Sequence, residues 1–360
     1  MNTTEKELFT RLVSFKGTDN DKLSELICDN ATPSVLGQLF FNRMQGAAYN
    51  TLKCAELLNK TTREFRNSLE AAHVQNTIKN NSFYIGVKQV VEILAKCKDK
   101  YAMLKGAVLC GLYPAGCRIS NDIDLLVRPK DVTIIGDTLH KAGFRQGSIK
   151  NGEFVPASRR EIITSKMMRG ETVPYILEVN LPYMRYLEVD INFSLDYKNS
   201  GERTVDKLLT RAEEVKIQGV NIPTLSDYDF FMHLCVHLYK EATTLPWIEM
   251  KRDMTLYKFS DIYMLTDMLT DFEVNKLFFE ARCLGISDIC AYAIIATSEL
   301  FDLKNRYAVE CAHEVLDGNE DILHKVISPS DKKTYMYMNE DISDRFFADN
   351  RATMLCEVVE

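Results

Sequence analysis

Apolar residues recur every three or four positions through the first hundred residues, which is the spacing of helices that bury one face. Pro33 is the only proline in this stretch, so little interrupts a helical backbone. The pattern is clearest over residues 82–98, where the apolar side chains that share one face are Phe83, Val87, Val90, Val91 and Leu94. The sequence therefore predicts an N-terminal helical region over residues 1–100.

From residue 101 the pattern changes to short apolar runs separated by glycine, proline and polar residues, which is typical of strands. Strands are predicted at 101–104, 122–127, 175–180, 186–195 and 219–224. Short helices are predicted at 107–113 and at 130–142, the second ending at Gly143 as its glycine C-cap. The pattern between 147 and 173 is too weak to assign.

Helical spacing returns after Ser226, where Asp229 three residues later resembles a capping signal. The sequence thus predicts a core of strands and helices over 101–225 and a C-terminal helical domain over 226–360. The last thirty residues are polar and are expected to fray.

The composition narrows the class of protein. The 360 residues are 46% apolar, which supports a sizeable buried core. The net charge of -7, from 44 basic and 51 acidic residues, disfavours nucleic acid as a partner without excluding it. Ten cysteines lack any C-x-x-C spacing and are interpreted as reduced core thiols. Neither a leader segment nor an apolar run of membrane-spanning length is found, so we expect a cytoplasmic protein without a membrane partner.

Two acids suggest a metal site. Asp122 and Asp124 lie two residues apart on a predicted strand, so their side chains project to the same face about 6.6 Å apart. Carboxylates this close favour a cation between them, and Mg²⁺ prefers such oxygens while leaving positions for phosphate oxygens. An isolated Asp-x-Asp is most often structural, but the apolar flanks, the upstream Lys105-Gly106 and a later strand acid favour the metal site.

A third carboxylate is needed if two metal ions are to serve transfer of a nucleotidyl group. The strand predicted at 186–195 places Glu188 and Asp190 on one face, and periodicity alone leaves both possible. We prefer Asp190, because its apolar neighbours make an unpaired charge costly without a metal. Glu178 on the preceding strand is a more distant candidate.

Groups that could hold phosphates surround this acidic pair in the sequence. Gly106 at a strand end permits close backbone approach, the following helix N-terminus favours anions, and Lys105 adds a positive charge. Arg118 and Ser120, just before the pair, offer a fork of donors and a hydroxyl.

Together, Leu104-Lys-Gly106, the Gly-Leu-Tyr-Pro that follows, and Arg118-Ile-Ser-Asn-Asp-Ile-Asp-Leu-Leu-Val127 resemble the uncharacterised nucleotidyltransferase family of the polymerase-β-like superfamily. The resemblance implies an α+β fold, in which a mixed sheet forms a nucleotidyltransferase core flanked by N-terminal and C-terminal helical regions. It also implies two Mg²⁺ or Mn²⁺ ions and a nucleoside triphosphate donor, with ATP expected. The chain departs from the family at Ala107, where many members have serine, and at Asn192, where the family often has histidine.

The leading hypothesis is an enzyme that moves a nucleoside monophosphate from a triphosphate to a hydroxyl of a small-molecule or peptide acceptor and releases pyrophosphate. Its catalytic metal ligands would be Asp122, Asp124 and Asp190. The residues that would hold the triphosphate are Lys105, Gly106, Arg118 and Ser120. The alternatives are a toxin or defence enzyme that modifies tRNA or protein by the same chemistry, and a non-catalytic protein that binds nucleotide or a partner.

One further cluster lies outside this motif. His233 and His237 are four residues apart on a predicted helix, with Glu241 one turn later, which is a conceivable zinc-binding face. Because no glutamate directly follows the first histidine, packing or hydrogen bonding is the favoured interpretation.

Overall fold

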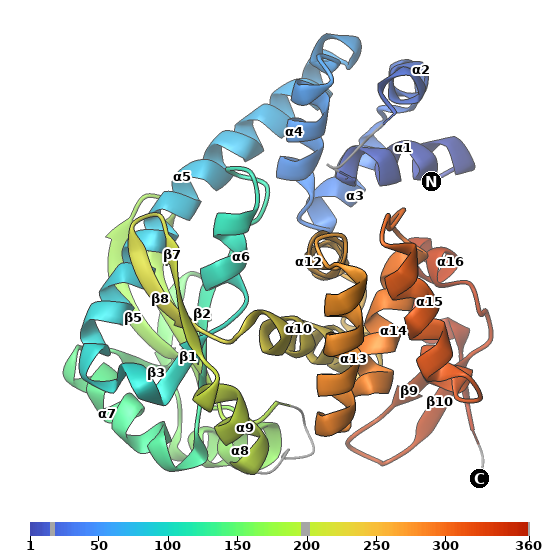
Figure 1. The fold of residues 1–360 in the computed structure, drawn as a ribbon. Helices are drawn as coiled ribbons and strands as arrows, with labels where there is room; N and C mark the ends of the chain where they lie inside the picture. Colours follow the sequence, from blue (N-terminus) through green and yellow to red (C-terminus); the bar gives the residue numbers. More distant parts are fainter. Residues whose placement is uncertain (15–18, 196–201, 359–360) are drawn as a thin grey trace. The chain divides into compact units, whose positions relative to one another are not determined.

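The computed structural model describes residues 1–14, 19–195 and 202–358, and its contacts divide the chain into two compact units. Unit 2 comprises residues 71–230, and unit 1 combines residues 1–70 with 231–360. Two helices, α5 (Arg63–Ile93) and α10 (Asp227–Ala242), contribute to both (Figure 1). The three domains predicted at 1–100, 101–225 and 226–360 stay a prediction.

Unit 2 is built on an eight-stranded sheet with the order β4-β3-β5-β6-β2-β1-β8-β7 (Figure 1). Its strands are β1 (Tyr101–Met103), β2 (Asp122–Val127), β3 (Arg145–Lys150), β4 (Glu153–Pro156), β5 (Tyr175–Leu181), β6 (Met184–Asn192), β7 (Glu213–Ile217) and β8 (Val220–Thr224). The pairs β2–β6 and β1–β8 are parallel, and the other neighbours are antiparallel. The predicted α+β class with a mixed sheet is confirmed.

The helical elements of unit 2 lie between these strands in the sequence. Besides α5 they are η2 (Ala95–Lys100), α6 (Gly106–Leu112), η3 (Pro129–Asp131), α7 (Val132–Lys141), α8 (Arg159–Arg169) and α9 (Glu202–Thr210). The predicted helix over 130–142 is α7, and Gly143 follows it at φ 99°, which a residue with a Cβ adopts only under strain. The unassigned stretch after residue 147 contains most of β3, all of β4 and helix α8, and the side chains of the two strands are mostly half-buried or exposed.

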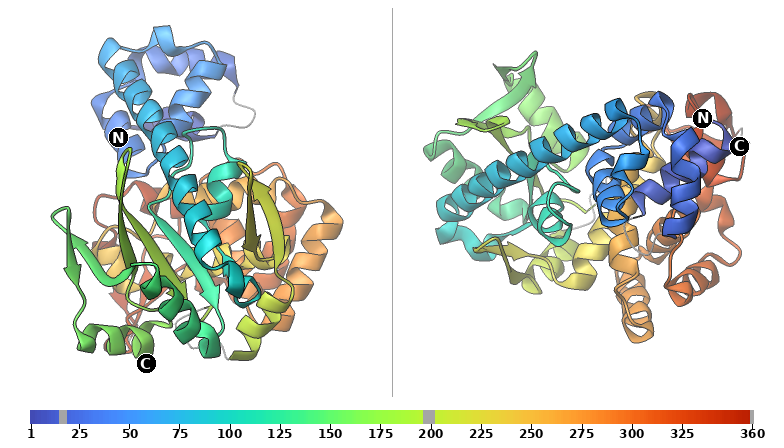
Figure 2. Two further views of the ribbon diagram at one scale, coloured as in Figure 1. Left: turned by 90° about the vertical axis from the view of Figure 1, so that its left-hand side faces the viewer. Right: turned by 90° about the horizontal axis from the view of Figure 1, so that it is seen from above.

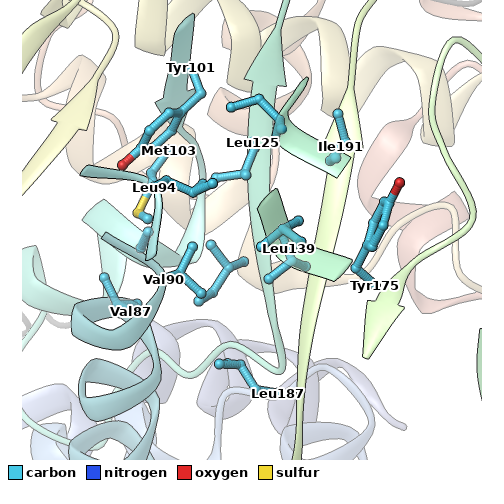
Figure 3. Close-up of a cluster of buried hydrophobic side chains, with 14 of the residues drawn as sticks. Val87, Val90, Leu94, Tyr101, Met103, Leu125, Leu139, Tyr175, Leu187 and Ile191 are labelled. Carbon is cyan, nitrogen blue, oxygen red and sulfur yellow. The ribbon is translucent and has the colours of Figure 1, made fainter. Parts of the chain in front are cut away.

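The core of unit 2 lies on one face of the sheet. Helix α5 runs across this face (Figure 2), and its apolar side chains pack with those of α7 against the central strands. Figure 3 shows Val87 and Val90 of α5, and Leu94 just after it, in one cluster with Leu125 of β2 and Leu187 of β6. Since side chains alternate along a strand, the even-numbered residues of β2 and residues 188, 190 and 192 of β6 project from the opposite face.

Unit 1 is mainly helical. Its elements are α1 (Thr3–Val13), α2 (Asn20–Asn30), α3 (Pro33–Phe41), α4 (Gln45–Cys54), η1 (Leu58–Lys60), α11 (Leu245–Glu249), α12 (Leu256–Thr266), α13 (Asp271–Leu284), α14 (Ser287–Ser298), α15 (Arg306–Leu316), η4 (Glu320–Leu323), β9 (Lys325–Ile327), β10 (Thr334–Tyr337), α16 (Ile342–Phe347), η5 (Arg351–Met354) and β11 (Leu355–Glu357). The expectation of a frayed C-terminus is wrong for the described residues, because β9, β10 and β11 form a sheet. Val326 and Tyr337 of this sheet bury against Ile248.

All ten cysteines lie in the described part of the chain as free thiols. The prediction of core thiols holds for Cys97, Cys110, Cys117, Cys235 and Cys290, which are buried. It is wrong for four that are exposed, namely Cys28, Cys54, Cys283 and Cys356. In the described ranges, no helix has the length and apolar character that crossing a membrane requires.

Candidate active site

The predicted acids meet on the face of the sheet opposite the core. β2 and β6 are hydrogen-bonded neighbours in parallel register, with Asp122 opposite Glu188 and Asp124 opposite Asp190. Residues paired in this way point to the same side of a sheet, so the four carboxyl groups share one face. The alternation that buries Ile123 and Leu125 on one side therefore places the acids together on the other.

Lys105 places its ammonium group among these acids. Its Nζ lies 2.9 Å from Oδ1 of Asp124, and Asp124 is only 5% exposed. The amide of Asn192, from the end of β6, donates a longer hydrogen bond of 3.4 Å to the same oxygen. Asp124 therefore lies between a cation from the β1–α6 turn and an amide from the neighbouring strand.

The β1–α6 turn has a backbone that few residues adopt. Lys105 has φ 46° and ψ -117°, a strained conformation for a residue with a side chain. The N–H of Leu104 donates to the carbonyl of Asp124 at 2.9 Å, which joins the turn to β2. A Cβ on Gly106 would lie 2.2 Å from Oγ of Ser120, so glycine is required where the turn passes that side chain.

Ser120 connects the turn to the first acid. Its hydroxyl donates to Oδ1 of Asp122 at 3.1 Å, and it is itself buried. The side chain therefore lies against Gly106 on one side and Asp122 on the other. In this structure Ser120 positions an acid, a contact that the sequence prediction of a phosphate-binding hydroxyl did not include.

Burial and the neighbouring charges raise the pKa values of Asp122, Glu188 and Asp190. Burial, followed by repulsion from Asp122 and Asp124, raises the pKa of Glu188 from 4.5 to about 7. Burial and then the charge of Asp124 raise the pKa of Asp122, and the same two causes raise the pKa of Asp190 well above its usual range. Burial alone would lower the pKa of Lys105, but the nearby acids outweigh it and raise the pKa. Lys105 therefore neutralises only part of the negative charge of these acids.

The acids suit a hard divalent cation in chemical type. Oδ1 of Asp190 is buried and has no hydrogen-bond partner among the described residues, so it can accept one from a bound group or ligate a cation. Carboxylate oxygens are the ligands that Mg²⁺ and Mn²⁺ prefer. Even so, within residues 1–14, 19–195 and 202–358 no three or more His, Cys, Asp or Glu side chains are arranged to hold a metal ion. The four acids share one face of the sheet, and the ammonium group of Lys105 lies among them.

Two asparagines of α5 hold the loop that precedes β2. The amide of Asn76 donates to the carbonyl of Gly116 at 3.1 Å, and the amide of Asn80 donates to the carbonyl of Arg118 at 2.8 Å. Both asparagines are buried. Neither asparagine was predicted from the sequence, although buried polar residues one turn apart on an apolar helix face are a signal of such anchoring.

The structure therefore brings some of the predicted site residues together and leaves others apart. The structure brings together Lys105, Gly106, Ser120, Asp122, Asp124 and Asp190. Arg118, which precedes Ser120 in the sequence, is buried, but its guanidinium donates to the carbonyl of Ile119. Glu178 forms an exposed ion pair with Arg185 instead.

The histidines of α10 lie in unit 1, away from this arrangement in the sequence. His237 approaches Glu241 at 3.6 Å, and Glu241 forms an ion pair with the buried Lys258. Lys258 also lies 5.8 Å from the ring of Trp247. These contacts agree with the favoured interpretation of packing and hydrogen bonding.

With the fold and the acidic face established, comparison places the chain among the nucleotidyltransferases. A family described as "Uncharacterised nucleotidyltransferase" matches residues 32–302, and the chain belongs to this family. A crystal structure of an antigenic nucleotidyltransferase-like protein from Paracoccidioides brasiliensis is similar, with 18% identity and a TM-score of 0.32. That similarity covers 51% of this chain and 77% of the other. No curated protein matches the chain.

Proposed function

We propose that this protein is a metal-dependent enzyme that transfers a nucleoside monophosphate from a triphosphate, with ATP as the expected donor, to a hydroxyl of a small-molecule or peptide acceptor. The observation that carries the proposal is the register of β2 and β6, which puts Asp122, Asp124 and Asp190 on one face. Membership of the family supports nucleotidyl transfer in general. A cytoplasmic location stays a prediction from the sequence.

Asp122, Asp124 and Asp190 are the residues that would hold Mg²⁺ or Mn²⁺. A bound divalent ion would lower the pKa of the acceptor hydroxyl and neutralise charge on the triphosphate. The raised pKa of Asp190 and the orphaned oxygen of its carboxylate fit a group that receives cation or proton. We prefer Asp190 to Glu188 because Asp190 is level with Asp124, the acid that Lys105 contacts.

In the proposed reaction the acceptor oxygen forms a bond to the α-phosphorus. The bond from that phosphorus to the oxygen bridging the β-phosphate breaks, and pyrophosphate leaves with the electron pair. The proton of the acceptor hydroxyl passes to the carboxylate of Asp190. Lys105 and the glycine turn at Gly106 would hold the triphosphate, whereas Ser120 would act mainly by positioning Asp122. Arg118 would contribute only after leaving the carbonyl that it contacts here.

The test is transfer of label from each of four α-labelled nucleoside triphosphates, with Mg²⁺ or Mn²⁺, to pools of small molecules, peptides and RNA. We expect label on a small molecule or peptide, and a loss of about a hundredfold or more in rate for Asp122→Asn, Asp124→Asn and Asp190→Asn. Asp137→Asn is the matched control, because Asp137 is exposed on α7, on the other side of the sheet.

Other outcomes point to the other hypotheses. Label found on RNA or on a whole protein would favour the toxin or defence enzyme. If wild type and Asp122→Asn bind triphosphate equally well and neither releases pyrophosphate, the proposal of an enzyme is refuted and a non-catalytic binding role is favoured.

A further inference from the structure

Lys105 contacts Asp124, one of the three acids proposed to hold the metal. Its Nζ is 2.9 Å from Oδ1 of Asp124, and its side chain is largely buried. Asp122 and Asp190 also attract this ammonium group, in addition to Asp124. A cation of the protein itself therefore already neutralises part of the acidic face.

This contact accounts for an apparent conflict in the site. The register of β2 and β6 places the acids on one face, yet no three of them are arranged as metal ligands in the described part of the chain. An ammonium group bound to Oδ1 of Asp124 competes directly for the oxygen that a divalent ion would use. The two observations agree if the lysine must move before a metal binds.

The backbone restricts this movement to the side chain. The hydrogen bond from Leu104 to the main chain of Asp124 fixes the residue before Lys105. Gly106, the residue after it, passes Ser120 too closely to admit a Cβ. The flexible four-carbon chain of Lys105 remains, and it can carry the ammonium group from the acids to a nearby anion.

We propose that Lys105 is a built-in counterion that excludes divalent metal from the ligand-free site and transfers to the triphosphate when metal and nucleotide bind together. The triphosphate offers the ammonium group new anionic partners, while the metal takes over the acids. Metal alone should thus bind weakly, and nucleotide should strengthen metal binding. This inference rests on the proposed function, since it assumes a metal and a triphosphate at the same acids.

The experiment measures binding of Mn²⁺ to the full chain by the electron paramagnetic resonance signal of free Mn²⁺. Titrations are made with Mn²⁺ alone and with Mn²⁺ plus the non-transferable analogue α,β-methylene-ATP. We expect Lys105→Met to bind Mn²⁺ alone at least about tenfold more tightly than wild type, and the analogue to strengthen that binding less than in wild type. Lys105→Arg, which keeps the charge, should remain close to wild type in Mn²⁺ alone.

Lys79→Met is the matched control, because Lys79 is half-buried and donates to Asn121, next to the acids in sequence. It removes the same charge without touching Asp124, so its Mn²⁺ affinity should change less than about threefold. The inference is overturned if Lys105→Met binds Mn²⁺ alone no more tightly than wild type, or if Lys79→Met gains as much as Lys105→Met.

Two further outcomes distinguish a failure of the proposed function from a failure of this inference alone. If Asp124→Asn binds Mn²⁺ with the analogue as tightly as wild type, the proposed metal site fails, and the inference fails with it. If only Lys105→Met disagrees, the proposed function stands and the inference alone is rejected. Should Lys105→Met unfold, recovery of its fold by Mn²⁺ would support the inference, and no recovery would overturn it.

Discussion

Replacing Glu188 with glutamine should stabilise the ligand-free protein at pH 8. Glu188 lies opposite Asp122 on the acidic face, and burial together with the charges of Asp122 and Asp124 raises its pKa from 4.5 to about 7. A folded state that binds a proton more tightly than the unfolded state loses stability when that proton is removed. Glutamine has no proton to lose, so this loss should disappear.

The size of the gain follows from the shift in pKa. At about 1.4 kcal/mol for each pKa unit, the shift corresponds to an upper bound of about 3 kcal/mol. Glu188 is partly exposed, and screening by solvent reduces this to about 1–2 kcal/mol. The penalty is absent below about pH 4.5, grows as the pH rises, and is complete above about pH 7. The two proteins should therefore diverge across that window.

Thermal unfolding of both proteins without divalent metal, from pH 4.5 to 8.5, measures this divergence. At pH 8 the melting temperature of Glu188→Gln should exceed that of wild type by about 2–8 °C. Glu153→Gln is a control of opposite sign, because hydrogen bonds and charge from Arg185 lower the pKa of Glu153. Equal or lower stability of Glu188→Gln at pH 8, or a difference that does not depend on pH, would refute the reasoning.

Three further substitutions test the frame of the site and of unit 1. Gly106→Ala should lose about 1–3 kcal/mol of stability in urea unfolding, because the new Cβ would lie 2.2 Å from Ser120. Gly37→Ala is the control and should lose none, because Gly37 lies within α3 and an added Cβ there would meet no atom within 4 Å. Asn80→Ala should cost about 1–3 kcal/mol in the same assay by leaving a buried carbonyl unpaired, and a cost near zero would contradict this. Asp253→Asn should cost about 3–5 kcal/mol, because it removes the charge of a buried carboxylate whose oxygens lie 2.6 and 2.7 Å from Arg351 of η5. Calorimetry measures this cost, and a value near zero would contradict the reasoning.

Much of the fold of unit 2 follows from local patterns in the sequence. The apolar runs at β1, β2, β5, β6 and β8 mark strands, because each is flanked by turn residues. The hairpin of β3 and β4 was not predicted, since its residues are mostly half-buried or exposed and carry no alternation of apolar side chains. The C-terminal sheet was missed for a related reason, because β9, β10 and β11 are only three or four residues long.

The acids of the site were predicted, but their pairing was not. The period of a strand places Asp122 and Asp124 on one face, and that inference needs no tertiary information. The parallel register that sets Asp190 level with Asp124 depends on which strands become neighbours, and no local pattern encodes that. For the same reason Glu188 and Asp190 could not be separated by periodicity.

The position of Lys105 lies still further from what the sequence predicts. A lysine before glycine at a strand end indicates a charge near the site, but not which partner it contacts. Its positive φ and its contact with Asp124 arise from the way the turn is held by β2 and Ser120. The sequence predicts that Lys105 holds phosphate, whereas in the structure its ammonium group contacts the carboxylate of Asp124.

The central claim is that Asp122, Asp124 and Asp190 share a divalent cation beside a triphosphate. Crystals grown with Mn²⁺ and α,β-methylene-ATP, measured at the manganese absorption edge, test this most directly. The account predicts an anomalous peak about 2.0–2.3 Å from carboxylate oxygens of β2 and β6, with triphosphate oxygens completing its shell. A peak elsewhere, or nucleotide bound away from these strands, would contradict it.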